Sequence, residues 1–254
     1  MIILPSRQES RIDSLKRYPI KFYHAFALIG LNSGITELDK LLGFIPKGKV
    51  VFIKGSQSRK HILKSFCLRA ISQYHNYCIF IDGGNSFDPY ILSKLATVSK
   101  QNPKEVLSRV IISRAFTCHQ LASLIVKETG KIVEAYTTNL VVVSDILYLF
   151  TDPESEIDKY ETEMILPKML KCLTNLAKQK DSIVIITSDN SSAWLSRMVE
   201  SFSDIALVVN NDNGMISVSL NKHPFLPHAS TTFTLELQPE KKIAKLESWM
   251  MING

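Results

Sequence analysis

The sequence has few cysteines and no long apolar run. Its 254 residues include four cysteines, and none of them forms a Cys-x-x-Cys pair or lies near a histidine pair at zinc-binding spacing. Scattered thiols of this kind are typical of a reducing compartment, and we expect no metal site. No apolar run reaches the roughly 20 residues that cross a bilayer, and the first residues lack the apolar core of a signal peptide. These absences predict a cytoplasmic protein without a membrane partner.

The composition is that of an ordinary globular chain with an excess of positive charge. Hydrophobic residues make up 45% of the chain and charged residues 21%, which suits one domain of this length. The net charge is +6 and the sequence pI is about 9.0, so contact with nucleic acid or another anionic surface is permitted. Basic residues among positions 1–25 indicate an N-terminal arm, and residues 26–254 form the expected core domain.

Short runs rich in valine and isoleucine alternate with helical patterns along the core. The expected strands are Val50–Ile53, Tyr77–Ile81, Val110–Ser113, Leu140–Val143 and Ser182–Thr187. The expected helices are Lys60–Tyr74, Asp88–Ser99, Cys118–Thr129 and Glu161–Gln179. This alternation predicts an α/β fold with a mostly parallel central sheet and helices on both faces. From Ile205 to Leu237, short strands around the turn Asn211–Gly214 predict antiparallel strands added at the C-terminal edge.

The loop after the first expected strand resembles a phosphate-binding loop with altered residues. A Walker A loop, GxxxxGK[ST], cradles phosphates with backbone amides, and its hydroxyl holds Mg²⁺. Aligned from Gly55 without a gap, the chain has Lys60, His61 and Ile62 at the last three positions. A one-residue deletion restores Lys60 as the lysine but puts Arg59 in place of glycine. Neither alignment gives a complete site.

Three stretches together resemble the RecA/RadA recombinase family, and more closely its shorter paralogues. They are LNSGITELDKLLGFIPKGKVVFIKG, the lead-in to the loop; IDGGNSFDP, after the second strand; and SRAFTCHQL, after the third. The similarity covers residues 28 to 236 and implies a RecA-like P-loop NTPase core.

The departures from that family's pattern fall on its ATP chemistry. The resemblance places Gly84 where the family has the glutamate that activates water, and Ser188 with Asp189 where it has an Asn-Gln pair. We therefore expect no catalytic residue and no cofactor, while weak binding of ATP and Mg²⁺ is left open. The expected vestigial nucleotide site consists of Gly55, Ser56, Ser58, Lys60, His61 and Asp145.

The loops that face DNA in the family differ here as well. The first, Thr151–Met164, carries six acidic residues and a single lysine, and such a loop repels DNA. DNA contact is therefore expected outside the usual groove. The candidate DNA-binding residues are Arg59, Lys60, Lys64 and Arg197. The arm also contains Phe22–Ala25, which matches the family's Phe-x-x-Ala docking peptide.

The resemblance implies a non-hydrolysing recombinase paralogue that acts as an accessory factor in homologous recombination and DNA repair. Expected partners are a RadA-type recombinase or another paralogue, and single- or double-stranded DNA; oligomer or heteromer formation and association with the nucleoid are left open. One alternative is a DNA-dependent ATPase of the same fold with an unorthodox loop. Another is a regulatory scaffold that binds protein without touching DNA.

Overall fold

The computed structural model describes residues 30–155, 157–190 and 192–234. The expected arm, including Phe22–Ala25, lies outside these residues. The described chain forms one eight-stranded sheet in the order β10-β9-β8-β3-β7-β6-β4-β5. Its strands are β3 (Val50–Gly55), β4 (Tyr77–Asp82), β5 (Val110–Arg114), β6 (Thr138–Ser144), β7 (Ile183–Ser188), β8 (Ile205–Asp212), β9 (Met215–Lys222) and β10 (Ala229–Thr234). A separate two-stranded sheet pairs β1 (Gly30–Leu31) with β2 (Ile45–Pro46).

Strand pairing confirms the predicted mixed sheet. Strands β8, β3, β7, β6, β4 and β5 run parallel to one another, while β9 and β10 join antiparallel at the C-terminal edge. The predicted turn closes the β8–β9 hairpin, with Asn213 and Gly214 both at positive φ. Central strands such as β3 and β6 are rich in β-branched residues and buried on both faces, as expected of a parallel sheet covered by helices.

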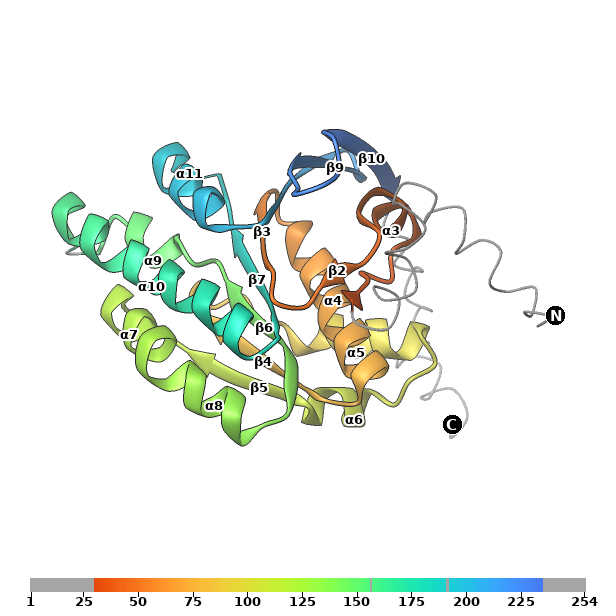
Figure 1. Cartoon of the computed structure of the whole chain (residues 1–254). Helices are drawn as coiled ribbons and strands as arrows, with labels where there is room; N and C mark the ends of the chain where they lie inside the picture. The colour runs from red at the N-terminus through yellow and green to blue at the C-terminus, as the bar shows by residue number, and fades with distance from the viewer. Residues whose placement is uncertain (1–29, 156, 191, 235–254) are drawn as a thin grey trace, which may run out of the picture.

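Helices cover the two faces of the sheet (Figure 1). One face packs against α3 (Thr36–Leu42), α4 (Arg59–Tyr74), α5 (Pro89–Val98) and α6 (Pro103–Ser108). The other packs against α7 (Cys118–Ser123), the π-helical η1 (Leu124–Glu128), α8 (Thr129–Ala135), α9 (Tyr148–Thr151), α10 (Lys159–Gln179) and α11 (Ala193–Phe202). In the described ranges no helix combines the length and the apolarity that crossing a membrane requires.

The predicted helix Cys118–Thr129 is too short, because the helical path continues through η1 to Ala135. The Thr129 hydroxyl donates to the Leu124 carbonyl at 2.8 Å, five residues back, and so supports the wider π turn. Gly130 is tolerated just after that turn, although glycine is unfavourable inside helices.

Candidate functional site

The candidate site lies at the carboxyl ends of β3, β6 and β7, where ligands bind in open parallel sheets. Gly55 ends β3 with φ +122°, and a Cβ there would lie 2.0 Å from the Val209 carbonyl oxygen. Only glycine allows β3 and β8 to approach this closely where the chain turns toward α4. The first glycine of the predicted loop therefore has a structural role in this chain.

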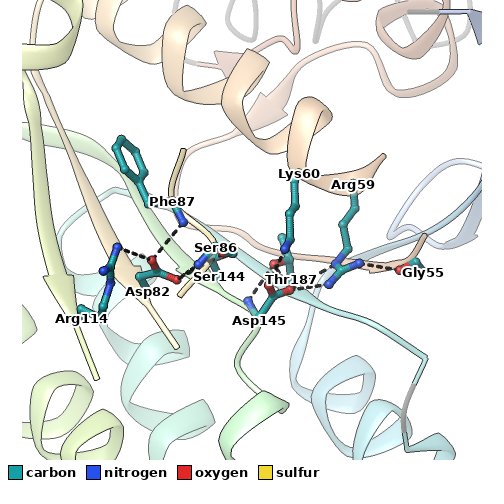
Figure 2. Close-up of polar contacts among 10 residues, drawn as sticks. All are labelled: Gly55, Arg59, Lys60, Asp82, Ser86, Phe87, Arg114, Ser144, Asp145 and Thr187. Atoms are coloured by element: carbon teal, nitrogen blue, oxygen red, sulfur yellow. Dashed lines mark hydrogen bonds and ion pairs between the residues drawn. The ribbon is translucent and has the colours of Figure 1, made fainter. Parts of the chain in front are cut away.

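Arg59 is the first residue of α4, and its side chain points inward across the loop (Figure 2). Its Nη2 donates to Asp145 Oδ1 at 2.6 Å, and its Nε donates to the same oxygen at 3.3 Å. Its Nη1 donates to the Gly55 carbonyl at 2.7 Å. The exposed fractions of the Arg59 and Asp145 side chains are only 3% and 7%. The guanidinium thus ties the loop to the end of β6 inside the protein.

Asp145 is also held by two other groups. Lys60 Nζ lies 3.6 Å from Oδ2, and the Asp145 amide donates to the Thr187 hydroxyl at 2.9 Å. Asp145 has φ +52°, a left-handed conformation that aspartate adopts more readily than most residues. The carboxylate that would stand beside Mg²⁺ therefore already has two cationic partners.

Gly84 lies against Asp145 on the neighbouring strand end. A Cβ at this position would be 2.6 Å from Asp145 Cβ and 2.9 Å from Oδ2. Contacts this short do not occur between real Cβ atoms and their neighbours, so any side chain here displaces Asp145 or the loop. The absence of a carboxylate at position 84 is thus coupled to the placement of Asp145.

The amides of the loop donate mostly to carbonyl groups of the protein. The Ser56 amide donates to Val209, and those of Arg59, Lys60 and His61 donate back into the loop at 3.0–3.1 Å. The space left between the loop and the two neighbouring strand ends is about 110 Å³, and its lining includes Lys60, Gly84 and Asp145. The described residues contain no cluster of three or more His, Cys, Asp or Glu side chains suited to a metal ion.

The remaining residues of the expected nucleotide site are held by neighbours or enclosed. The Ser58 hydroxyl accepts a hydrogen bond at 2.8 Å from Asn211, on the β8–β9 hairpin. Ser56 Oγ and His61 Nδ1 are enclosed without a hydrogen-bond partner in the described part of the chain. Burial lowers the pKa of His61, and the nearby charge of Lys64 lowers it further.

Two of the four candidate DNA-binding residues are buried in the structure. Arg59 is buried against Asp145, and Lys64 is only 1% exposed inside the core face of α4. Burial also lowers the pKa of Lys64. Lys60 is partly exposed and Arg197 is exposed on α11, so DNA contact through these two side chains stays a prediction.

Comparison with known protein families agrees with this architecture. The Rad51 family model matches residues 26–204. The chain belongs to the Rad51 family. The predicted recombinase-type core is thereby confirmed.

Individual Rad51-family relatives align with part of the chain. The DNA repair protein Rad51 homolog of Drosophila melanogaster is 31% identical over 176 residues, which are 66% of this chain and 52% of that protein. The DNA repair protein RAD51 of Saccharomyces cerevisiae is 28% identical over 171 residues, 63% of this chain and 42% of that protein. The DNA repair protein rhp51 of Schizosaccharomyces pombe is 26% identical over 208 residues, 74% and 57% respectively. The chain spans about half the length of the curated relatives it matches.

A second polar network beside this Rad51-type site was not anticipated from the sequence. Asp82 ends β4 fully buried; it accepts from the Ser86 and Phe87 amides at 2.8 and 3.0 Å and pairs with Arg114 at 3.3 Å (Figure 2). Ser86 and Ser144 hydroxyls meet at 2.6 Å and join this network to β6. The sequence signal was present, because the IDGGNSF stretch places an acid at a strand end four residues before a serine.

Proposed function

We propose that this chain is a non-hydrolysing member of the Rad51 family that serves homologous recombination and DNA repair as an accessory factor. The observation that carries the proposal is the buried Arg59–Asp145 ion pair, in which the guanidinium occupies the carboxylate at the end of β6 that would stand beside Mg²⁺. Phosphoryl transfer depends on several groups acting together to position and neutralise the phosphates. Here the water-activating position holds Gly84, and the phosphate loop is closed by its own arginine.

The size and polarity of the space support the same proposal. Small-molecule pockets usually enclose about 300–1,000 Å³, several times the volume between Lys60 and Asp145. A triphosphate would also need amides that now donate to protein carbonyls, and it would need Mg²⁺ to displace Arg59 from Asp145. Each displacement costs contacts that are made in the ligand-free fold.

The names of the relatives support the cellular role. The Drosophila, Saccharomyces and Schizosaccharomyces proteins are all named DNA repair proteins. A family member without ATP turnover would contribute by binding, and its partners would be a Rad51-type recombinase, another paralogue or DNA. Lys60 and Arg197 are the cations of the original candidate set that remain accessible to DNA.

Phosphate release from Mg-ATP, with and without single-stranded DNA, tests the absence of hydrolysis. The wild-type rate should equal that of Asp145→Asn, because that variant removes the carboxylate at the end of β6 beside which Mg²⁺ would stand, and a chain that does not hydrolyse ATP loses nothing by it. Thermal unfolding measures binding: a nucleotide at 100 times its Kd stabilises by about 2.7 kcal/mol, which raises Tm by about 5–10 °C in a protein of this size. We expect a shift below about 1 °C at millimolar Mg-ATP. DNA-stimulated turnover that Asp145→Asn abolishes would instead establish the ATPase.

A further inference from the structure

A groove of about 510 Å³ lies beside the nucleotide-type site, beyond the carboxyl ends of β5 and β6. It is lined by the start of α7, by α9, by the segment before α10 and by the first turn of α10, which lie together on one side of the sheet (Figure 1). Its apolar lining includes Phe116, Leu149 and Ile157. Leu149 and Ile157 also pack against the hydrophobic core of this face, so the core holds the floor of the groove in place.

The rim of the groove is negatively charged. Asp152, Glu154 and Glu161 line it, and Asp158 stands at the N-cap of α10. Glu161 lies 3.4 Å from His119, but Asp152, Glu154 and Asp158 form no ion pair within the described ranges. Carboxylates that lack an ion-pair partner at a rim attract cations and repel nucleic-acid phosphates.

Large apolar side chains are exposed at the edge of this groove and on the helices next to it. Phe116 is 70% exposed at its edge, and Tyr160 and Met164 follow on the first turns of α10. Trp194 on α11 is exposed as well, and its ring lies 5.8 Å from Lys159 Nζ at the start of α10. These four belong to the eleven large apolar side chains that are exposed in the described ranges. Exposed aromatic and methionine side chains gathered over neighbouring elements mark interaction surfaces.

We propose that this groove binds a basic segment of a partner protein, with apolar side chains on the groove floor and Arg or Lys at the acidic rim. Charge complementarity favours this occupant, because the acidic rim repels DNA and a free cation would make no favourable contact with the apolar floor. Arginine suits the site doubly, since its guanidinium pairs with carboxylates and stacks on aromatic rings. The proposal does not depend on whether the neighbouring site turns over ATP.

The test measures fluorescence anisotropy of a short labelled peptide of alternating arginine and leucine with the full chain. The controls are an alternating glutamate and leucine peptide, and labelled single-stranded DNA. Glu154→Lys reverses an exposed charge at the rim, and Glu105→Lys makes the same change in net charge on α6, on the other face of the sheet. Phe116→Ala removes the exposed apolar edge while its amide contact to Gln120 remains available.

We expect Glu154→Lys to weaken binding of the basic peptide about 5-fold or more, and Phe116→Ala to weaken it comparably. Glu105→Lys should change it less than about 2-fold. Glu154→Lys should also raise the affinity for DNA, because it removes repulsion. Equal weakening by the two lysine variants would overturn the proposal, as would no binding of the basic peptide or a loss of DNA affinity in Glu154→Lys. Light scattering that shows self-association abolished by Glu154→Lys would assign the groove to a second copy and overturn it too.

Discussion

Arg59→Met tests whether an internal ion pair holds the loop in the place of a ligand. Methionine keeps much of the side-chain volume but removes the guanidinium from Asp145 and from the Gly55 carbonyl. Removing one partner of a buried pair costs about 3–5 kcal/mol, because the other charge stays buried without compensation. Lys60 remains 3.6 Å from the Asp145 carboxylate and compensates part of that charge. We therefore expect a loss of about 3 kcal/mol, at the lower end of this range.

Urea unfolding followed by far-UV circular dichroism measures this loss as a free energy of unfolding. Asp145→Asn and the double variant complete a double-mutant cycle, and the two changes should be coupled by about 1–3 kcal/mol. Lys131→Met is the matched control, because it breaks an exposed pair with Glu128 and should cost less than about 0.5 kcal/mol. A loss below about 1 kcal/mol for Arg59→Met, or additive effects in the cycle, would refute the idea that the pair organises the loop.

Three further substitutions test other parts of the argument. Gly84→Ala should lower the free energy of unfolding in urea by about 1–3 kcal/mol, since the added Cβ meets Asp145. Gly130→Ala should raise it slightly, because the space around Gly130 in α8 is open. A change of the same sign in both variants would contradict the steric explanation. Lys64→Met should leave the free energy of unfolding unchanged or raise it, because it replaces a buried cation by an apolar side chain; a loss above about 2 kcal/mol would show that the ammonium is needed. Burial lowers the pKa of His223 from 6.5 to about 4, so unfolding takes up a proton between these values and stability falls as pH drops from 6.5 to 4. His223→Asn should show a smaller fall over this window in thermal unfolding, and an unchanged pH profile would count against the shift.

Much of the fold followed from the sequence, because its signals are local. Continuous apolar runs such as Val50–Ile53 predicted strands that are buried on both faces, and the Asn-Gly turn predicted the hairpin at the edge of the sheet. The length of the α7–α8 helix did not follow, because Gly130 resembles a helix terminator and a π turn leaves no clear pattern. These errors concern where an element ends and leave its place in the sheet unchanged.

The burial of the charged side chains at the candidate site did not follow from the sequence. Arg59, Lys60 and Lys64 form a basic run in the sequence, yet two of them are buried in the structure. Whether a helix-start cation faces solvent depends on what lies across the loop, and Asp145 is 86 residues away in the chain. Two departures from the family pattern could have been considered together: Arg59 stands in place of a loop glycine, and Gly84 stands in place of the glutamate.

These changes at the site depend on one another. Gly84 makes room for Asp145, and Asp145 in turn receives Arg59, whose guanidinium closes the loop through the Gly55 carbonyl. Restoring glutamate at position 84 alone would force a side chain into the Asp145 carboxylate and add a second negative charge beside it. Replacing Arg59 by glycine alone would leave Asp145 with Lys60 as its only cation in the described site, while the loop amides still donate to protein carbonyls. We therefore expect each single reversal to lower the stability of the fold before it raises the affinity for phosphate.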